Sequence, residues 1–202
     1  MSAVNESIVR EYFESLGYLV RQPHKHLGPG RQKEEGEDVD MVVFNPRVRE
    51  HKVPGSLVLR TEDLKTVGSA AVSIHGWHTD RLYTSTLDQA PELIRFTEPG
   101  AVRFAARILG TTTFAKILCI PRLPASGELK DQTVQTLKAR GVDGLLTFRT
   151  ILAELVSRID TNRNYEKSDL LQVIRLLKNY DLLKDSQLEL FGRKRRRSKP
   201  AK

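Results

Sequence analysis

The first half of the chain has the apolar spacing of one helix followed by three strands. Apolar residues recur on one helical face between positions 8 and 16, and Gly17 follows where a left-handed residue ends a helix. The expected strands are residues 18–20, 38–44 and 70–75. Residues 23–36 are rich in Gly, Pro, His and charge, which predicts a loop, and Gly76 marks a bend after the third strand.

The second half alternates between helical and strand patterns. The expected helices are residues 97–110, 129–140, 150–159 and 168–180, and the expected strands are residues 114–120 and 142–148. Nearly continuous apolar runs such as residues 114–120 suit parallel strands that are covered on both faces. Early strands joined by loops and later strands joined by helices predict an α/β fold, with a mixed central sheet flanked by helices in the order αβββαβαβαα.

The segment between the second and third strands is harder to assign. Residues 47–55 are polar and show no periodicity, so we expect an excursion from the sheet, with residues 57–59 pairing briefly at an edge. Asp63 and Lys65 then form an Asp-x-Lys tripeptide, but the surrounding residues alternate poorly as a strand and favour a turn or the start of a helix.

Composition favours one domain in a reducing compartment. The chain has 202 residues and a single cysteine, Cys119, whose apolar neighbours predict a buried strand position. No signal-peptide pattern and no apolar stretch long enough to span a bilayer is present, so we expect a cytoplasmic protein without a membrane partner. Residues 1–191 are expected to form one domain, and residues 192–202 a basic flexible tail.

The positive charge is concentrated at the end of the chain. Lys and Arg number 33 against 25 Asp and Glu, a net charge of +8, but seven of the bases fall in the last ten residues. Without those ten residues the balance is 26 against 25, or +1. The tail either binds phosphates in a salt-dependent, sequence-independent way or simply solubilises the chain. The tail bases that are the candidate nucleic-acid contacts are Arg193, Lys194, Arg195, Arg196 and Arg197.

Three segments carry a resemblance to a known family. The helix that contains Glu6, the strand that contains Asp38 and Asp40, and the strand that contains Ser73 and His75 occur in that order along the chain. This order resembles the restriction-endonuclease-like, or PD-(D/E)xK, superfamily, which includes tRNA-splicing-endonuclease-like and Holliday-junction-resolvase-like domains. In that family a helix that often bears a Glu precedes an Asp strand and then a Glu-x-Lys or Asp-x-Lys strand. The resemblance implies Mg²⁺-assisted phosphodiester hydrolysis, with Glu6, Asp40, Ser73 and His75 at the catalytic positions.

The presumed catalytic strand departs from the family motif. Ser73 and His75 share one strand face, as the motif requires, but they replace its acid and its lysine. Serine does not supply the missing negative charge to a hard cation, and a neutral imidazole does not replace a lysine at a phosphate. Two alternatives stay open: the Asp63-x-Lys65 tripeptide, or an ion such as Mn²⁺ held by Asp38, Asp40 and His75, with His75 as general base.

Other polar residues have a functional and a structural interpretation. Trp77, His78 and Arg81 follow the catalytic strand and are candidate nucleic-acid contacts. Lys116 is, like Arg81, a plausible phosphate contact. Alternatively, Trp77 plugs the sheet edge, His78 caps a turn, and Arg81 and Lys116 are ordinary surface bases. His24 and His26 either share a metal or are solvated loop residues, and we favour the latter. Neither a Walker loop nor a G-x-S-x-G elbow is present in the sequence.

The sequence therefore predicts a nucleic-acid-binding domain of nuclease-like fold whose catalysis is lost or altered. Its partner is DNA or RNA, and Mg²⁺ or Mn²⁺ is the expected cofactor only if catalysis persists. One alternative is a metal-dependent endonuclease that uses Asp40 with unusual partners. The other is a protein-interaction domain on a pseudo-nuclease scaffold, which contacts protein subunits and no nucleic acid.

Overall fold

The computed structural model describes residues 3–23 and 38–183 of the chain. The density of contacts divides the chain into two compact units, Met1–Leu155 and Val156–Lys202. The first unit holds all the strands of the sheet, and the second holds the end of α5 (Phe148–Arg158) and α6 (Asp169–Asn179). The predicted domain end at residue 191 lies outside the described residues.

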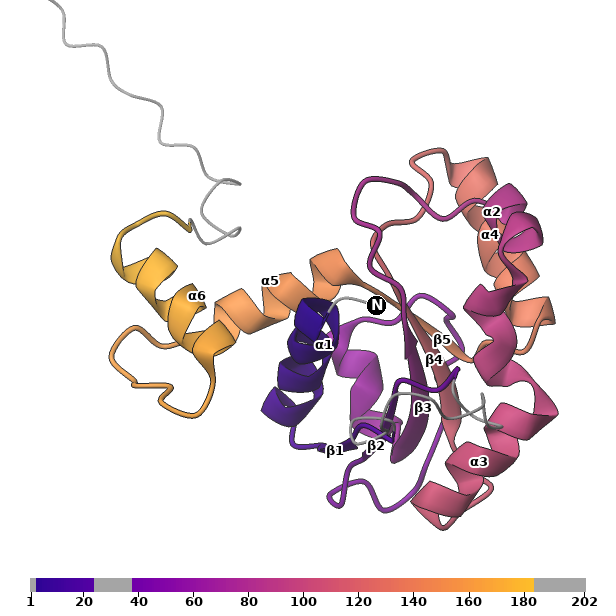
Figure 1. Ribbon diagram of the computed structural model, residues 1–202, viewed down its shortest axis with the longest axis horizontal. Helices are drawn as coiled ribbons and strands as arrows, with labels where there is room; N and C mark the ends of the chain where they lie inside the picture. Colours follow the sequence, from indigo (N-terminus) through magenta and orange to yellow (C-terminus); the bar gives the residue numbers. More distant parts are fainter. Residues whose placement is uncertain (1–2, 24–37, 184–202) are drawn as a thin grey trace, which may run out of the picture. The chain divides into compact units, whose positions relative to one another are not determined.

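A five-stranded mixed sheet forms the centre of the first unit (Figure 1). Its strands are β1 (Leu19–Arg21), β2 (Met41–Phe44), β3 (Ser69–Ile74), β4 (Ala115–Ile120) and β5 (Gly144–Thr147), and they lie in sequence order. The first three strands pair antiparallel, whereas β3, β4 and β5 run parallel. Since helices flank this sheet, the predicted α/β fold class is confirmed.

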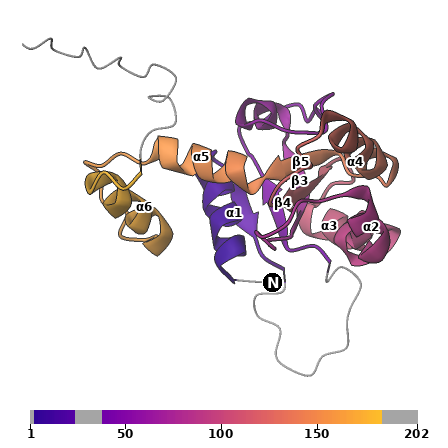
Figure 2. The same cartoon turned by 90° about the horizontal axis from the view of Figure 1, so that it is seen from above.

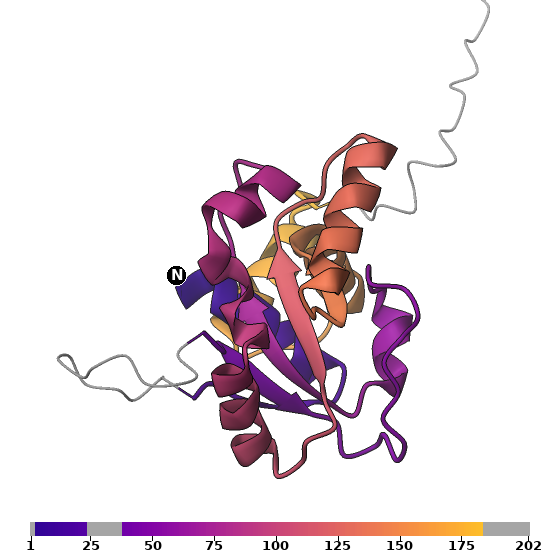
Figure 3. The ribbon, with the colours of Figure 1, turned by 90° about the vertical axis from the view of Figure 1, so that its right-hand side faces the viewer.

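Helices cover both faces of the sheet. On one face lie α2 (Thr84–Gln89), the 3₁₀ helix η2 (Pro91–Thr97), α3 (Pro99–Leu109) and α4 (Gly127–Ala139). Figure 3 shows this side, with α3 and α4 on either side of β4. On the other face lies α1 (Ala3–Ser15), and Figure 2 shows α1 and the α2–α4 group on opposite sides of the strands. The apolar stripe of α1 is buried, as its spacing predicted.

Two short elements are missing from the predicted order of elements. The helix α2 and the 3₁₀ helix η2 lie between β3 and α3, where the sequence predicted no helix before residue 97. Each is only six or seven residues long, so neither repeats an apolar position often enough to show a helical period. A further 3₁₀ helix, η1 (Thr61–Thr66), occupies the segment for which a turn or a helical start was predicted.

The segment before η1 pairs with the last strand of the sheet. The Leu59 N–H donates to the Leu145 carbonyl at 2.9 Å, and the Leu145 N–H donates to the Leu57 carbonyl at 2.7 Å. These bonds confirm the predicted edge pairing of residues 57–59, which we call the edge strap. The strap lies so close to β5 that a Cβ on Gly144 would collide with the Leu59 side chain.

Two further predictions concern the burial of Cys119 and the glycine that ends a helix, and a third concerns membrane-spanning helices. Cys119 is fully buried in β4, as its apolar neighbours predicted. Gly17 and Gly110 adopt positive φ angles of 89° and 69° and end α1 and α3. Among the described residues, no helix is long and apolar enough to cross a membrane.

Candidate functional site

The structure brings Asp40, Ser73 and His75 together at the carboxyl end of β3. Continuing the antiparallel register of β2 and β3 by one residue places Asp40 opposite Ser73. One Asp40 carboxylate oxygen accepts the Ile74 backbone N–H at 2.6 Å, and the carboxylate also forms a hydrogen bond with the Ser73 side chain. The Asp40 N–H donates to Val72, so pairing continues although the observed β2 begins at Met41, three residues later than predicted.

Ser73 and His75 lie on the same face of the sheet, as the motif geometry predicted. Ala71, which shares that face, packs in the core beneath α2 and α3. The Ser73 Oγ lies 3.1 Å from His75 Nε2, and the Ser73 side chain is only 3% exposed. The result is a continuous hydrogen-bonded row from Asp40 through Ser73 to His75.

Burial makes the Asp40 carboxyl a weak acid. It raises the pKa of Asp40 from 3.8 to about 7, and the nearby Glu6 carboxylate adds to the increase, while the hydrogen bonds from Ile74 and Ser73 oppose it. At neutral pH a large share of the Asp40 side chains is therefore protonated and uncharged.

The same burial makes the His75 imidazole a weak base. It lowers the pKa of His75 from 6.5 to about 4, although a hydrogen bond to the Leu93 backbone and the charges of Glu92 and Asp38 oppose the decrease. The ring is neutral at pH 7, so it carries no charge to a phosphate. A general base of nearly ordinary pKa, which the manganese alternative requires, is not what this environment provides.

The predicted metal ligands do not fit a divalent cation. Within residues 3–23 and 38–183, no three His, Cys, Asp or Glu side chains form a group that could hold a metal. The Glu6 carboxylate accepts a hydrogen bond from the Gln22 amide at 2.8 Å, and the Asp40 carboxylate accepts one from the Ile74 N–H of β3. A hard cation prefers several charged oxygen ligands, and this site offers a half-protonated Asp40 and a serine. We therefore assign no metal step to it.

A buried asparagine on α1 holds the loop that follows β3. The Asn5 Nδ2 donates to the Gly76 carbonyl at 3.3 Å, and the Asn5 Oδ1 lies 2.9 Å from His78 Nε2. Any Cβ at Gly76 would overlap the Asn5 amide. Asn5 was not predicted from the sequence, although a polar residue within the apolar stripe of a helix is a signal of such a role.

The aromatic residues of this loop have structural partners. Trp77 packs against the core beneath α2–α4, and its ring lies 5.8 Å from the His75 ring. The His78 ring meets the Phe148 ring edge-on at 4.7 Å. Trp77 and His78 therefore both have partners within the fold, Trp77 in the core and His75, and His78 in Asn5 and Phe148.

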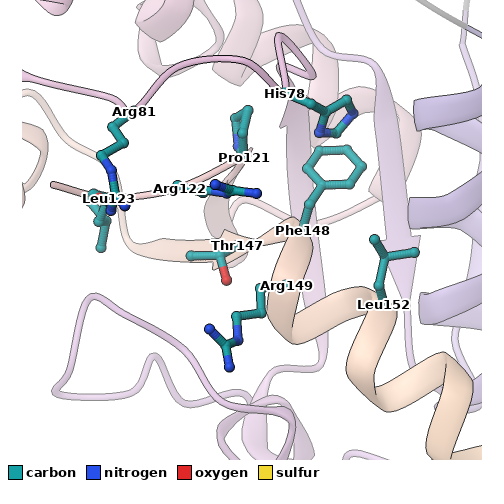
Figure 4. A pocket seen from close by; sticks show the side chains of 9 residues that line it. All are labelled: His78, Arg81, Pro121, Arg122, Leu123, Thr147, Phe148, Arg149 and Leu152. Carbon is teal, nitrogen blue, oxygen red and sulfur yellow. Dashed lines mark hydrogen bonds between the residues drawn. The ribbon is translucent and has the colours of Figure 1, made fainter. Parts of the chain in front are cut away.

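A pocket of about 460 Å³ opens beyond the carboxyl ends of the parallel strands (Figure 4). It is lined by His78, Arg81, Pro121, Arg122, Leu123, Thr147, Phe148, Arg149 and Leu152. His78 and Arg81 follow β3, Arg122 follows β4, and Arg149 is the second residue of α5, which follows β5 directly. Ligand sites of open α/β sheets commonly lie beyond the carboxyl ends of the strands.

The pocket lining is positively charged. It contains three arginines and no carboxylate. Arg81 is held in place because its Nη1 donates to the Leu123 carbonyl at 3.0 Å. Arg122 and Arg149 are exposed, and among the described residues no ion pair involves either of them. Thr147 accepts the Thr150 N–H at 3.2 Å and so caps the start of α5.

The arginines that line the pocket were mostly missed in the sequence. Arg81 was predicted as a nucleic-acid contact, but Arg122 and Arg149 were not singled out. The available signal was their position, since each follows the end of a parallel strand by two residues.

The remaining candidates lie elsewhere. The Lys116 Nζ pairs with the Asp143 carboxylate at 2.8 Å, near the amino ends of the parallel strands. Asp63 accepts the Arg60 N–H at 2.7 Å and thereby caps the start of η1, so the Asp63-x-Lys65 tripeptide lies on a 3₁₀ helix and not on a strand. The candidates that fall outside the described residues are His24, His26, Arg193, Lys194, Arg195, Arg196 and Arg197.

Comparisons of this chain with protein-family models, with curated proteins and with solved structures find no match. Two features therefore remain as candidates for function: the row from Asp40 to His75 and the arginine-lined pocket. Both lie at the carboxyl ends of the parallel strands.

Proposed function

We propose that this chain is a nucleic-acid-binding domain of nuclease-like fold in which phosphodiester hydrolysis is lost or altered. The observation that carries the proposal is a difference in charge between the row and the pocket, which both lie at the carboxyl ends of the parallel strands. Groups suited to hold a cation are absent from the row Asp40–Ser73–His75, while arginines suited to hold phosphates line the neighbouring pocket.

The proposed loss of hydrolysis is supported by the charges of the row. Metal-assisted hydrolysis needs anionic ligands and a group that activates water. At neutral pH the Asp40 carboxyl is only partly ionised, and His75 is a weak base. Ser73 is buried and hydrogen-bonded, so its hydroxyl is not available to a substrate. Under this proposal the row keeps the positions of a hydrolytic site without their charge.

Nucleic-acid binding is supported by where the positive charge gathers. Apart from the last ten residues the chain is nearly neutral, with 26 basic and 25 acidic residues, yet three arginines line one pocket. Guanidinium groups form paired hydrogen bonds with phosphate oxygens, and they remain charged at every physiological pH. The basic tail would add affinity that does not depend on sequence.

A cleavage and binding assay tests this proposal. The full chain, Asp40→Asn and a chain ending at residue 192 are incubated with labelled DNA and RNA in Mg²⁺ or Mn²⁺. We expect salt-sensitive binding that survives removal of the tail, and no cleavage. Asp40→Asn keeps an oxygen for the Ile74 N–H and should bind as the unchanged chain does.

Two results would contradict the proposal. Metal-dependent cleavage that disappears in Asp40→Asn would show an active endonuclease. Absence of binding to either nucleic acid at low salt, in a chain that is folded by circular dichroism, would leave the protein-interaction domain as the better explanation.

A further inference from the structure

The arginine-lined pocket has a charge that matches one kind of phosphate better than another. Its lining carries three guanidinium groups and no carboxylate. A phosphodiester within a strand has one negative charge, whereas a phosphate monoester has about −1.5 to −2 at pH 7 and three terminal oxygens. Three cations around one cavity therefore suit the monoester.

The three arginines of the pocket come from segments that follow neighbouring parallel strands. Arg81 comes from the loop after β3, Arg122 from the loop after β4, and Arg149 from the first turn of α5, as Figure 4 shows. Arg81 is oriented by its bond to Leu123, while Arg122 and Arg149 have no ion-pair partner among the described residues. The start of α5 adds the partial positive charge of a helix N-terminus.

The size and the apolar part of the lining indicate more than a bare phosphate ion. A volume of about 460 Å³ lies within the range of small-molecule sites, roughly 300–1,000 Å³, and exceeds what one phosphate fills. Leu152 is 37% exposed and His78 is exposed at the pocket, so a sugar or a base attached to the phosphate would contact them.

We propose that this pocket binds the phosphate monoester of a 5′-nucleotide, with Arg122 and Arg149 as the principal contacts. The nucleotide is either the 5′-phosphorylated end of a nucleic-acid strand or a free nucleoside monophosphate. The first source rests on the proposed nucleic-acid-binding function, whereas the second is independent of it.

The experiment compares matched ligands and matched variants of the full chain. The ligands are an oligonucleotide labelled at its 3′ end, with either a 5′-phosphate or a 5′-hydroxyl, and adenosine 5′-monophosphate with adenosine as its partner. The test variant is the double substitution Arg122→Gln and Arg149→Gln. The control is Arg49→Gln, an exposed arginine in the excursion after β2. Its neighbour His51 accepts the Gly68 N–H at 3.1 Å just before β3 begins, at the strand end opposite to the pocket.

The expected result is a preference for the phosphorylated member of at least one ligand pair. We expect roughly tenfold tighter binding, which corresponds to about 1.4 kcal/mol, and a preference below about twofold in the double variant. Arg49→Gln should keep the full preference. Because both substituted arginines are exposed, the melting temperature should remain unchanged in all variants.

The outcomes separate this inference from the proposed function. Equal binding of both oligonucleotides, together with no preference for the monophosphate over adenosine, overturns the pocket assignment and leaves nucleic-acid binding standing. A preference that persists in the double variant also overturns it. Monophosphate binding that needs both arginines, without binding of any strand, supports the pocket and contradicts the proposed function.

Discussion

Asp40 is an acid placed where its charge is costly. Its carboxyl is buried beside Ile74 and Ser73, and the Glu6 carboxylate lies near enough to disfavour ionisation further. Since the neutral form is preferred in the folded chain, Asp40 links the protonation of this site to the stability of the fold.

The substitution Asp40→Asn should stabilise the protein increasingly as the pH rises above about 4. The folded pKa of about 7 exceeds the ordinary value of 3.8, so the folded chain holds this proton more tightly and loses stability as the pH rises between those values. Asparagine is always neutral, so its advantage over aspartate should grow from near zero at about pH 4 to roughly 2–4 kcal/mol at about pH 8. Denaturant unfolding of both proteins across this range measures the difference.

His75 acts in the opposite direction and serves as the internal check. Its folded pKa of about 4 lies below 6.5, so its contribution to stability is lost as the pH falls through that interval. Because His75 is present in both proteins, subtracting their free energies of unfolding leaves mainly the Asp40 carboxyl. A difference that does not change with pH would show that Asp40 is not a buried neutral acid.

Gly76→Ala should destabilise the fold and loosen the loop after β3. The new Cβ would displace the Asn5 amide, which bonds to both Gly76 and His78, and the expected loss is about 1–3 kcal/mol. Gly55→Ala is the matched control, because nothing lies within 4 Å of a Cβ there. Thermal unfolding of the two variants should separate them by several degrees, and equal melting temperatures would contradict the close approach.

Part of the site could be predicted from the sequence because it lies on paired strands. The alternation of side chains along a strand is enough to place Ser73 and His75 on one face. Arg122 and Arg149 could not be grouped in this way, because they meet Arg81 only when β3, β4 and β5 align. Nor does a sequence show how deeply Asp40 is buried, and burial determines its pKa.

At the scale of elements, long periodic segments were predictable and short ones were not. The glycine-terminated helices α1 and α3 and the continuous apolar strand β4 agree with their patterns. The helix α2 and the 3₁₀ helix η2 escaped prediction because each spans only six or seven residues, too few to repeat an apolar position with a helical period. They matter to the site, since η2 supplies the Leu93 backbone that bonds to His75.

The edge strap should contribute measurably to stability. Leu59 is 2% exposed, and it packs against Gly144 while its backbone pairs with Leu145. We expect Leu59→Ala to lower the free energy of unfolding by about 2–4 kcal/mol, measured by denaturant titration.

The control for the strap is another strand-associated leucine. Leu19 on β1 is 64% exposed, so Leu19→Ala should change the free energy of unfolding by less than about 0.5 kcal/mol. Similar effects of the two substitutions would mean that the strap packs no more tightly than an exposed edge.

For the whole molecule, the distribution of charge matters more than its total. The net charge of +8 belongs largely to the last ten residues. Elsewhere, three arginines line the pocket at the carboxyl ends of the parallel strands. These two sources of positive charge should make separable contributions to binding.

Removing residues 193–202 should weaken nucleic-acid binding without abolishing it. Each phosphate contact adds about 0.9 to the slope of log affinity against log salt for duplex DNA, so the truncated chain should show a markedly shallower slope. Adding Arg122→Gln and Arg149→Gln should reduce the slope by about 2 more. Affinity measured at several salt concentrations tests both statements, and an unchanged slope after truncation would place the tail outside the interface.

The edge strap also determines when the sheet can be completed during synthesis. Residues 57–59 are synthesised before β3, β4 and β5, yet their hydrogen-bond partner Leu145 lies on the last strand. Until that strand is made, the apolar side chains of Leu57 and Leu59, which are buried in the complete fold, have no strand to pack against. A nascent chain that stops short of β5 therefore exposes them, and the first half of the protein depends on its last strand to finish its backbone pairing.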